Sequence, residues 1–231
     1  MEREDLQEEM ERELRAKGNN TNVSPAVIKR LPRYFRYLRE LIREGKLRIS
    51  SGELSERMHV TASQIRQDLN CFGGFGQQGY GYNVNYLYAK ICDLLGVGEG
   101  YSAIVIGAGN LGRALVRNPM FEKRGVDIIG MFDVSADMIG KEIAGIKVYD
   151  MRELEEFCHS HKVDMAVLTL PKDHALEVAE RLVAAGVRGL WNFTGRELDH
   201  LCRDAVVENV HLGDSLMTLC YELRLQHEEE E

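Results

Sequence analysis

The sequence has no pattern that would bind a structural zinc ion or build a disulfide framework. Its five cysteines are widely spaced and form no Cys-x-x-Cys pair, and no histidine pattern accompanies them. An odd number of such cysteines predicts reduced thiols and no metal site. These residues are Cys71, Cys92, Cys158, Cys202 and Cys220.

Long apolar segments are also absent. No apolar run approaches the ~20 residues that a membrane-spanning helix needs. Residues 1–5 (MERED) are charged and lack the apolar region of a secretion signal. We therefore predict a cytoplasmic protein with no membrane partner.

The 231 residues carry no overall excess of positive charge, because the formal net charge is −8. The charge is unevenly distributed, however. Residues 23–90 hold 11 Lys and Arg against 5 Asp and Glu, a charge of +6, whereas residues 1–22 and 91–231 carry −3 and −11. Only the 23–90 segment is suited to bind a polyanion. A chain of this length is expected to form two domains.

The first apolar pattern predicts a helix from Ser24-Pro25 to about Glu44. Serine is a favoured N-cap, and proline is favoured at the first helical position. Pro32 lies inside the segment and predicts a kink or a restart of the helix. The apolar residues recur at steps of three and four, which indicates one buried stripe. The stripe consists of Ile28, Leu31, Phe35, Leu38 and Ile42.

Two short helices at residues 51–58 and 62–71, separated by a turn at 60–61, have helix-turn-helix spacing. Leu54, Met58, Ile65 and Leu69 would form their small core. Side chains on the opposite face of the second helix would then face DNA. The expected DNA-contacting residues of this helix are Ser63, Gln64, Arg66 and Gln67.

These assignments leave two questions open. Arg66 can reach either a guanine edge or a phosphate. The two helices can also form a small dimerisation bundle with a solvated basic face.

The following segment, 73–82 (GGFGQQGYGY), combines turn-forming glycines with strand-forming aromatic residues and predicts a β-wing. Gln77, Gln78 and Tyr80 of this wing are further candidates for DNA contacts.

From Tyr101 onward, apolar strands alternate with helices such as 111–117 and 174–185, which predicts an α/β fold with a parallel sheet covered on both faces. A closing helix capped by Asp214 is apolar on more than one side, so it docks either on a partner or within the chain. The expected strands lie at residues 103–106, 128–132, 146–148, 165–170, 190–193 and 206–212.

A glycine-rich loop, Gly107-Ala108-Gly109-Asn110-Leu111-Gly112, follows the first of these strands and opens a helix. This is the fingerprint of dinucleotide-binding domains. Its first glycine makes the tight turn, the second admits the pyrophosphate, and the third allows close packing of helix and strand. The phosphates would lie at the helix N-terminus.

Asp133 ends the next strand, 21 positions beyond Gly112. A carboxylate there accepts hydrogen bonds from the adenosine ribose and repels a 2′-phosphate, which favours NAD+ and NADH over the phosphorylated cofactors. Asp133 also argues against the alternative of a domain that binds coenzyme A or has only a structural role.

An enzyme is the rival interpretation, as an NAD-dependent oxidoreductase with an N-terminal interaction module. The Tyr86-x-x-x-Lys90 spacing occurs in short-chain dehydrogenases, but here it precedes the glycine loop instead of following it. The histidines share no spacing with a carboxylate that would define an acid–base pair. We therefore expect no catalytic residues.

The order of these motifs resembles the Rex family of redox-sensing transcriptional repressors over nearly all of residues 24–225. The matching segments are 30–38 (RLPRYFRYL), 65–69 (IRQDL), 72–82 (FGGFGQQGYGY), 107–112 (GAGNLG), 132–133 (FD) and 207–210 (VENV).

The resemblance implies a homodimer whose winged helices bind an inverted repeat and whose Rossmann-type domains bind NADH and NAD+. The last helix would cross to the partner subunit. NADH binding would close the dimer and release the operator DNA, whereas NAD+ would compete weakly. The implied domains are residues 1–22 (acidic extension), 23–90 (winged helix-turn-helix), 91–213 (Rossmann domain) and 214–231 (dimerisation helix and acidic tail).

Three positions depart from the pattern of the better-known family members. Asn118 stands where the family often has tyrosine, His211 where it usually has aspartate, and Gln67 where it often has lysine, whereas the matching Arg36 is retained. The switch implied by the family pattern is an aspartate that exchanges partners between this arginine and the tyrosine. It cannot operate here, because Asn118 and His211 replace the tyrosine and the aspartate. Arg36, Asn118 and His211 are therefore our candidates for a modified switch.

Redox discrimination would then use another contact near the nicotinamide, with Thr169 and Pro171 as the nearest candidates. Otherwise it would be weaker and pH-sensitive through a hydrogen bond from Arg36 to His211. A third alternative is that His211 merely packs at the surface.

Overall fold

A computed structural model describes residues 23–70, 81–198 and 204–229 of the chain. The acidic extension at residues 1–22 lies outside these ranges. The chain divides into two compact units, one ending at Val97 and the other beginning at Gly98. The boundary predicted after residue 90 falls within helix α5 (Val84–Leu94), whose Ile91 is still buried in the core of the N-terminal unit.

The N-terminal unit is a small helical domain with a two-stranded sheet. Ile49 pairs with Tyr82 in antiparallel register. Gly81 has φ +68°, and a Cβ there would lie 2.6 Å from the Ile49 carbonyl oxygen, so the entry into the second strand requires glycine. The elements before α5 are α2 (Pro25–Arg43), β1 (Arg48–Ile49), α3 (Ser51–Met58), α4 (Ala62–Asn70) and β2 (Tyr82–Asn83).

Helix α2 begins as predicted, with the Ser24 side chain accepting a hydrogen bond from the Val27 N–H and with Pro25 in its first turn. Pro32 lies inside one continuous helix, so the helix does not restart there. The predicted stripe was wrong at Ile28, which is 37% exposed. Because α2 packs against both α3 and α5, its buried face is wider than a single stripe. That face comprises Val27, Leu31, Tyr34, Phe35, Leu38 and Leu41.

Helices α3 and α4 form the predicted helix-turn-helix. Ser50 and Glu53 make a reciprocal capping box at the start of α3. His59 ends this helix in the left-handed conformation with φ 50°. The predicted core is confirmed, because all four of its side chains are fully buried. The tip of the predicted wing, with Gln77, Gln78 and Tyr80, lies outside the described residues.

The C-terminal unit contains a seven-stranded sheet in the order β5-β6-β4-β3-β7-β8-β9. All neighbouring pairs are parallel except β5 with β6, which form an antiparallel hairpin; the strand at β6 was predicted, whereas β5 was not. The order reverses at β3, between β4 and β7, which is where doubly wound folds bind ligands. The strands are β3 (Tyr101–Ile106), β4 (Val126–Asp133), β5 (Glu142–Ile143), β6 (Ile146–Asp150), β7 (Met165–Leu168), β8 (Gly189–Asn192) and β9 (Val206–Asn209).

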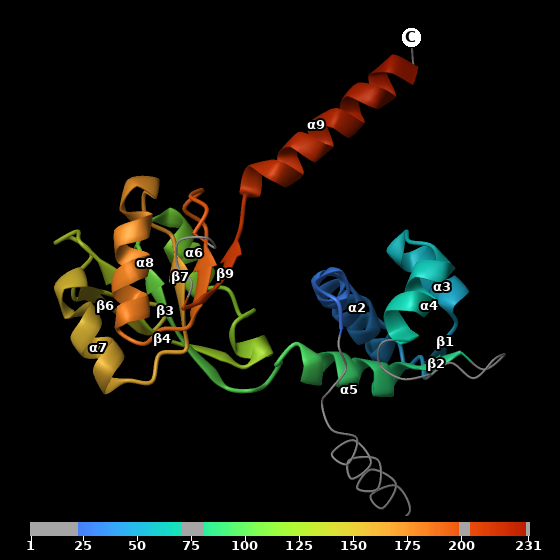
Figure 1. Cartoon of the computed structure of the whole chain (residues 1–231), viewed down its shortest axis with the longest axis horizontal. Helices are drawn as coiled ribbons and strands as arrows, with labels where there is room; N and C mark the ends of the chain where they lie inside the picture. Colours follow the sequence, from blue (N-terminus) through green and yellow to red (C-terminus); the bar gives the residue numbers. More distant parts are fainter. Residues whose placement is uncertain (1–22, 71–80, 199–203, 230–231) are drawn as a thin grey trace, which may run out of the picture. The chain divides into compact units, whose positions relative to one another are not determined.

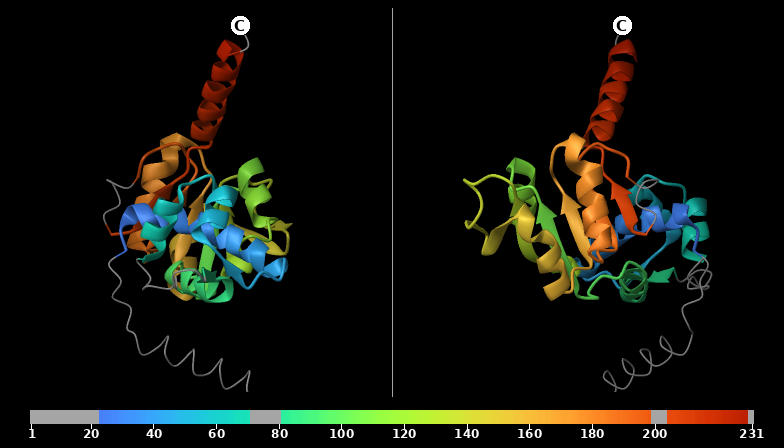
Figure 2. Two further views of the ribbon diagram at one scale, coloured as in Figure 1. Left: turned by 90° about the vertical axis from the view of Figure 1, so that its right-hand side faces the viewer. Right: turned by 60° about the vertical axis from the view of Figure 1, so that its left-hand side comes forward.

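Helices cover both faces of this sheet, as predicted. Ile104 and Ile106 pack in one apolar cluster with α7 (Leu154–Ser160) and α8 (Ala175–Ala184). Val105, between them, points to the opposite cluster, which includes residues of α6 (Asn110–Val116). Figure 1 shows α8 in front of the strands with α6 behind them, and Figure 2 shows the same layers from two other sides. Three short 3-10 turns complete the unit, at η1 (Glu122–Arg124), η2 (Met151–Glu153) and η3 (Lys172–His174).

The last helix, α9 (Leu212–Glu229), starts two residues before the predicted cap, so Asp214 lies in its first turn. Its apolar side chains are exposed along its length. They include Leu212, Leu216, Met217, Leu219, Tyr221, Leu223 and Leu225. No helix in the described part of the chain is long and apolar enough to cross a membrane.

Candidate functional sites

The glycine loop between β3 and α6 has a separate structural reason for each glycine. Gly107 has φ +100°, and a Cβ there would lie 2.6 Å from the Thr169 carbonyl oxygen. A Cβ at Gly112 would lie 2.0 Å from the Gly107 carbonyl oxygen. By contrast, a Cβ at Gly109 would meet no atom within 4 Å. The first and third glycines are therefore required for folding, whereas the second leaves open space beside the backbone.

Thr169, which follows β7, fastens this loop. Its hydroxyl lies 3.0 Å from the carbonyl oxygens of Ile106 and Gly107 and donates to them. The N-cap position of α6 is Gly109, which has no side chain to cap the helix. The first turn of α6, with Asn110 and Leu111, therefore presents backbone N–H groups beside that open space.

Asp133 stands at the carboxyl end of β4 and holds the loop from the other side. Its Oδ2 accepts a hydrogen bond from the Ala108 N–H at 2.5 Å, and its Oδ1 accepts one from the Ser135 N–H at 2.8 Å. A carboxylate has about four acceptor positions. Asp133 is thus fixed in orientation while keeping capacity to accept further hydrogen bonds.

A cavity of about 690 Å³ lies at the carboxyl edge of the sheet, bounded by this loop and by the end of β4. Gly107, Gly109, Asp133, Thr169 and Pro171, all predicted from the sequence, line it. Further lining residues include Val134, Met151, His174, Glu177, Val178 and Arg181, which sequence reasoning missed.

Arg181 in the cavity wall is paired with a carboxylate. Its Nε and Nη2 donate to the two oxygens of Glu155 at 2.6 and 3.1 Å, and Nη2 also donates to the Met151 carbonyl at 2.9 Å. The hydrogen bonds from Arg181 lower the pKa of Glu155. Arg181 thus joins α8 to α7 and η2 with its charge offset. No local motif signals this contact, because its partners are far apart in the sequence.

On α4, Ser63, Arg66 and Gln67 are exposed as predicted. Gln64, expected to point outward with them, is half-buried, and its Nε2 donates to Asp68 Oδ1 at 2.8 Å, while its contact with DNA stays a prediction. Gln64 lies beside the buried face because Asp68, one turn later, is itself fully buried.

Asp68 is a buried carboxylate that joins α4 to α2. Arg30 donates to its two oxygens at 2.7 and 2.6 Å, and the Tyr34 hydroxyl donates to Oδ2 at 3.0 Å. Burial raises the pKa of Asp68, but the hydrogen bonds from Arg30, Gln64 and Tyr34 outweigh burial and hold that pKa below its ordinary value. Asp68 therefore stays ionised and sets how α4 sits on α2. The sequence analysis missed this role.

Two of the switch candidates lie in the C-terminal unit. Asn118 is exposed after α6, and its Oδ1 accepts a hydrogen bond from the Met120 N–H at 3.0 Å. The Nε2 of His211 lies 2.8 Å from Glu197 Oε1. Arg36 is exposed on α2 in the other unit, and its contact with His211 stays a prediction.

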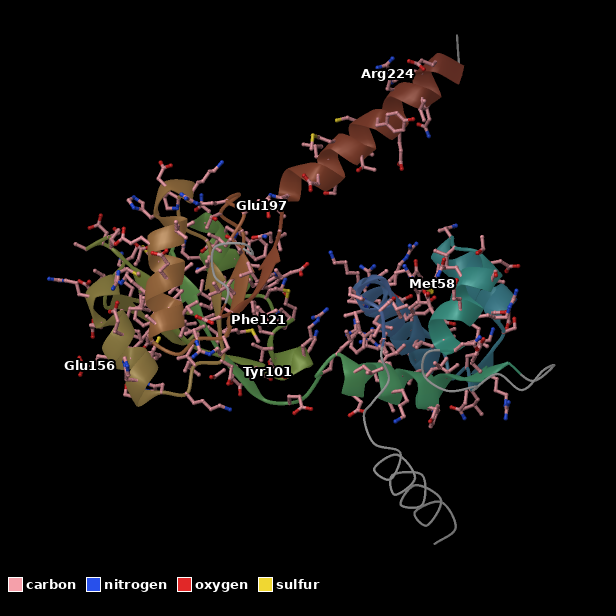
Figure 3. The ribbon with its side chains drawn as sticks, in the orientation of Figure 1. Met58, Tyr101, Phe121, Glu156, Glu197 and Arg224 are labelled. Carbon is pink, nitrogen blue, oxygen red and sulfur yellow. The ribbon has the colours of Figure 1, made fainter. Side chains whose placement is uncertain are left out.

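The partner of His211 belongs to a chain of polar side chains at the ends of β8 and β9. Glu197 Oε2 accepts from Asn209 Nδ2 at 2.8 Å, and Asn209 Oδ1 accepts from Asn192 Nδ2 at 2.7 Å. Asn192 is fully buried at the end of β8. Figure 3 shows Glu197 beside the end of α9 that follows β9. A continuous polar path therefore runs from the sheet to the residue before α9.

Across residues 23–70, 81–198 and 204–229, no group of three or more His, Cys, Asp or Glu side chains could hold a metal ion.

Comparisons with known proteins match both units of the chain. One family model, described as a putative DNA-binding protein N-terminus, matches residues 22–70, and another, described as a CoA binding domain, matches residues 99–195. The redox-sensing transcriptional repressor Rex of Thermoanaerobacter pseudethanolicus is 51% identical over 92% of this chain and 93% of that protein. The Rex of Caldanaerobacter subterraneus is 52% identical with the same coverage. The chain belongs to the Rex family.

Solved Rex structures have the same fold. A crystal structure of the Rex-family repressor RSP with beta-NAD+ and operator DNA has a TM-score of 0.82 and 50% identity, covering 90% of this chain and 95% of that chain. RSP with beta-NADH has a TM-score of 0.83 and 47% identity, covering 90% and 98%. The predicted fold class, an N-terminal DNA-binding domain followed by a Rossmann-type domain, is confirmed. The crossing of the last helix to a partner subunit stays a prediction. Rex relatives are named as repressors, which confirms the prediction of a regulator over that of an oxidoreductase.

Proposed function

We propose that this Rex protein represses transcription by binding operator DNA through its N-terminal unit, and that NADH in the cavity at the carboxyl edge of the sheet releases the DNA. The single observation that carries the proposal is the glycine loop. Gly107 and Gly112 are required for packing, and Gly109 lines a cavity that is also lined by Asp133. RSP, with about half of its residues identical, has been solved with NAD+ and operator DNA and with NADH.

In this proposal the pyrophosphate lies beside Gly109 and the first turn of α6, within reach of the N–H groups of Asn110 and Leu111. Gly107, Ala108 and Gly112 build the loop. Asp133 receives the adenosine ribose. Thr169 and Pro171, after β7, are on the side expected for the nicotinamide half, since β7 begins the second half of the doubly wound sheet.

The N-terminal unit would bind one half of an inverted repeat, with Ser63, Gln64, Arg66 and Gln67 contributed by α4. Gln77, Gln78 and Tyr80 remain proposed contacts of the wing. Two copies are needed for an inverted repeat, and the exposed apolar side chains of α9 are suited to hold a homodimer together. A repressor acts where the DNA is, so we place the protein in the cytoplasm.

The test is a titration of a fluorescent operator duplex with the full chain at fixed salt, in the presence of NADH, NAD+, NADPH or coenzyme A. We expect NADH to weaken DNA binding by about 5- to 150-fold, the usual range of coupling between two sites, and NAD+ to have a much smaller effect. Coenzyme A is included because of the family model over residues 99–195. Equal operator affinity with and without saturating NADH would contradict the proposal.

A further inference from the structure

The exposed side chains of α4 differ in the direction in which they are oriented. Ser63 and Gln67 lie one turn apart on the side opposite the buried Ile65 and Leu69. Arg66 lies to one side of this pair, and its Nη1 donates a hydrogen bond to Ser51 Oγ at 3.1 Å. The guanidinium group is therefore directed toward α3 instead of straight outward from α4.

Ser51 is the first residue of α3, the first helix of the helix-turn-helix. In complexes of this motif the N-terminal residues of the second helix contact base edges in the major groove, while the first helix crosses the sugar–phosphate backbone. A side chain on α4 that turns toward the start of α3 is accordingly turned toward the backbone and away from the bases.

The donors of Arg66 favour the same assignment. Bidentate reading of guanine needs two adjacent N–H groups aimed at O6 and N7, and the hydrogen bond to Ser51 directs the guanidinium toward α3 instead of straight outward from α4. A phosphate can accept hydrogen bonds from any of the donors that remain. Glu53, the acidic residue in the first turn of α3, would otherwise repel a phosphate. It is engaged by Lys46 Nζ at 2.7 Å and by the Ser50 N–H at 2.9 Å.

We propose that Arg66 contacts a DNA phosphate with Ser51 as its positioning residue, and that Ser63 and Gln67 read the sequence. The proposal rests on the DNA-binding function proposed above. It settles the alternative that the sequence leaves open, between a guanine edge and a phosphate for Arg66.

The test uses the full chain and a duplex that the wild-type chain selects from a random pool in the absence of nucleotide. Affinities are measured by fluorescence anisotropy at several salt concentrations and for every single-base-pair change in the duplex. For Arg66→Ala we expect the slope of log K against log salt to fall by about 1.8 for a dimer on its duplex, about 0.9 for the one phosphate that each copy of Arg66 contacts. Its affinity for all the changed duplexes should fall by one common factor.

Two further variants sharpen the result. Arg66→Lys keeps the charge but loses the planar fork, so its salt slope and its ranking of duplexes should match those of the wild type. Ser51→Ala should weaken all duplexes equally, because it removes only the group that orients Arg66. Ser63→Ala and Gln67→Ala are matched controls on the same helix, and they should change the ranking of duplexes while leaving the slope unchanged. Urea unfolding of each variant, followed by circular dichroism of the helices, verifies that the N-terminal unit is folded.

Loss of discrimination at one base pair in Arg66→Ala, with an unchanged salt slope, would overturn the proposal. So would an Arg66→Lys variant that ranks the duplexes differently from the wild type. If the wild-type chain selects no duplex at all, the DNA-binding function itself is refuted, which separates the two failures.

Discussion

Gly109 and Gly112 belong to one loop, yet substitution by alanine should affect them in opposite ways. The Cβ of Gly112→Ala would lie 2.0 Å from the Gly107 carbonyl oxygen. We expect this variant to lose at least about 1–3 kcal/mol of unfolding free energy, as in overpacked cores. Gly109→Ala meets no protein atom within 4 Å, so its stability should equal that of the wild type while its NADH affinity falls.

Thermal unfolding without nucleotide and NADH titration of both variants provide the measurement, and each variant is the control for the other. A Gly109→Ala variant with normal NADH affinity would show that the dinucleotide does not occupy the space beside this residue. An unstable variant would contradict the open space itself.

Asp133 is expected to determine which nicotinamide cofactor binds. Asp133→Arg should weaken NADH binding and improve NADPH binding, because a cation replaces the ribose acceptor and attracts the 2′-phosphate. Asp127→Arg is the matched control, since Asp127 is an exposed carboxylate on the same strand. Calorimetric titration with both cofactors measures the effect. If NADH affinity is unchanged in a folded Asp133→Arg variant, the ribose binds elsewhere.

His211 shows why a family pattern does not transfer residue by residue. The aspartate usual in the family would place a second carboxylate beside Glu197, whose Oε1 now lies 2.8 Å from the histidine. We expect His211→Asp to be destabilising, and Glu197→Gln to relieve the repulsion. The coupling should be about 0.2–1 kcal/mol, since both side chains are partly exposed. A double-mutant cycle of unfolding free energies measures it, and additive effects would exclude the contact.

At the scale of elements, α4 is fixed to α2 by one buried carboxylate. Replacing Asp68 by asparagine should cost roughly 2–3 kcal/mol, less than the 3–5 kcal/mol of a fully buried pair, because Arg30 is 35% exposed. Glu56→Gln, at an exposed carboxylate of the same unit, is the control. Urea unfolding of the full chain measures both variants, and a cost no larger than that of Glu56→Gln would refute the role of Asp68.

The contact between Asp68 and Arg30 also predicts how the free energy of unfolding depends on pH. The pKa of Asp68 is lower in the folded chain than its ordinary value of 3.8. Its contribution to stability is therefore complete above the unfolded pKa of about 3.9 and is lost as the pH falls through the lower folded pKa. The stability difference between wild type and Asp68→Asn should be constant from about pH 7 to 5 and shrink below about pH 4. A difference that grows on acidification would contradict this sign.

Several elements followed directly from the sequence, because local chemistry decides them. Ser24-Pro25 capped α2, and the helix-turn-helix core was predicted residue by residue. Strand β5 of the β5–β6 hairpin was missed because it is two residues long and is joined to β6 by Ala144-Gly145, both with positive φ. Such turns are usually signalled by Asn-Gly or Asp-Gly. On α2 the predicted stripe was wrong only at Ile28, and it left out Val27, Tyr34 and Leu41 because packing on two sides buries more of a helix than one periodic face.

The residues of the candidate sites also include some that the sequence predicted and some that it did not. The glycine loop and Asp133 are recognisable because their spacing along the chain reflects the fold. Arg181, Glu155 and Met151 meet only after α7, α8 and η2 pack together. The pairing of His211 with Glu197 likewise depends on a loop between β8 and β9. Contacts of this kind have no periodic signature, so the sequence alone could not predict them.

For the whole molecule, the exposed apolar face of α9 predicts an oligomer. Leu212, Leu216, Leu219 and Leu223 recur at steps of four and three, which places them along one stripe. Leu216→Glu combined with Leu223→Glu should produce monomers in light scattering and abolish binding to an inverted repeat. Thr218→Glu, at an exposed position outside the stripe on the same helix, is the control and should remain oligomeric. A double variant with an unchanged mass would mean that α9 is not the interface.

Helix α9 also has a mechanical consequence. Only Val210 and His211 separate it from β9, and the polar path from Asn192 ends at His211. A helix of 18 residues is about 27 Å long at 1.5 Å per residue. Tilting it by roughly 5° at His211 would displace its far end by about 2 Å over that length. A rotation of α9 about His211 would thus convert a displacement of a few tenths of an ångström beside Glu197 into a several-fold larger displacement at the C-terminal end of the helix.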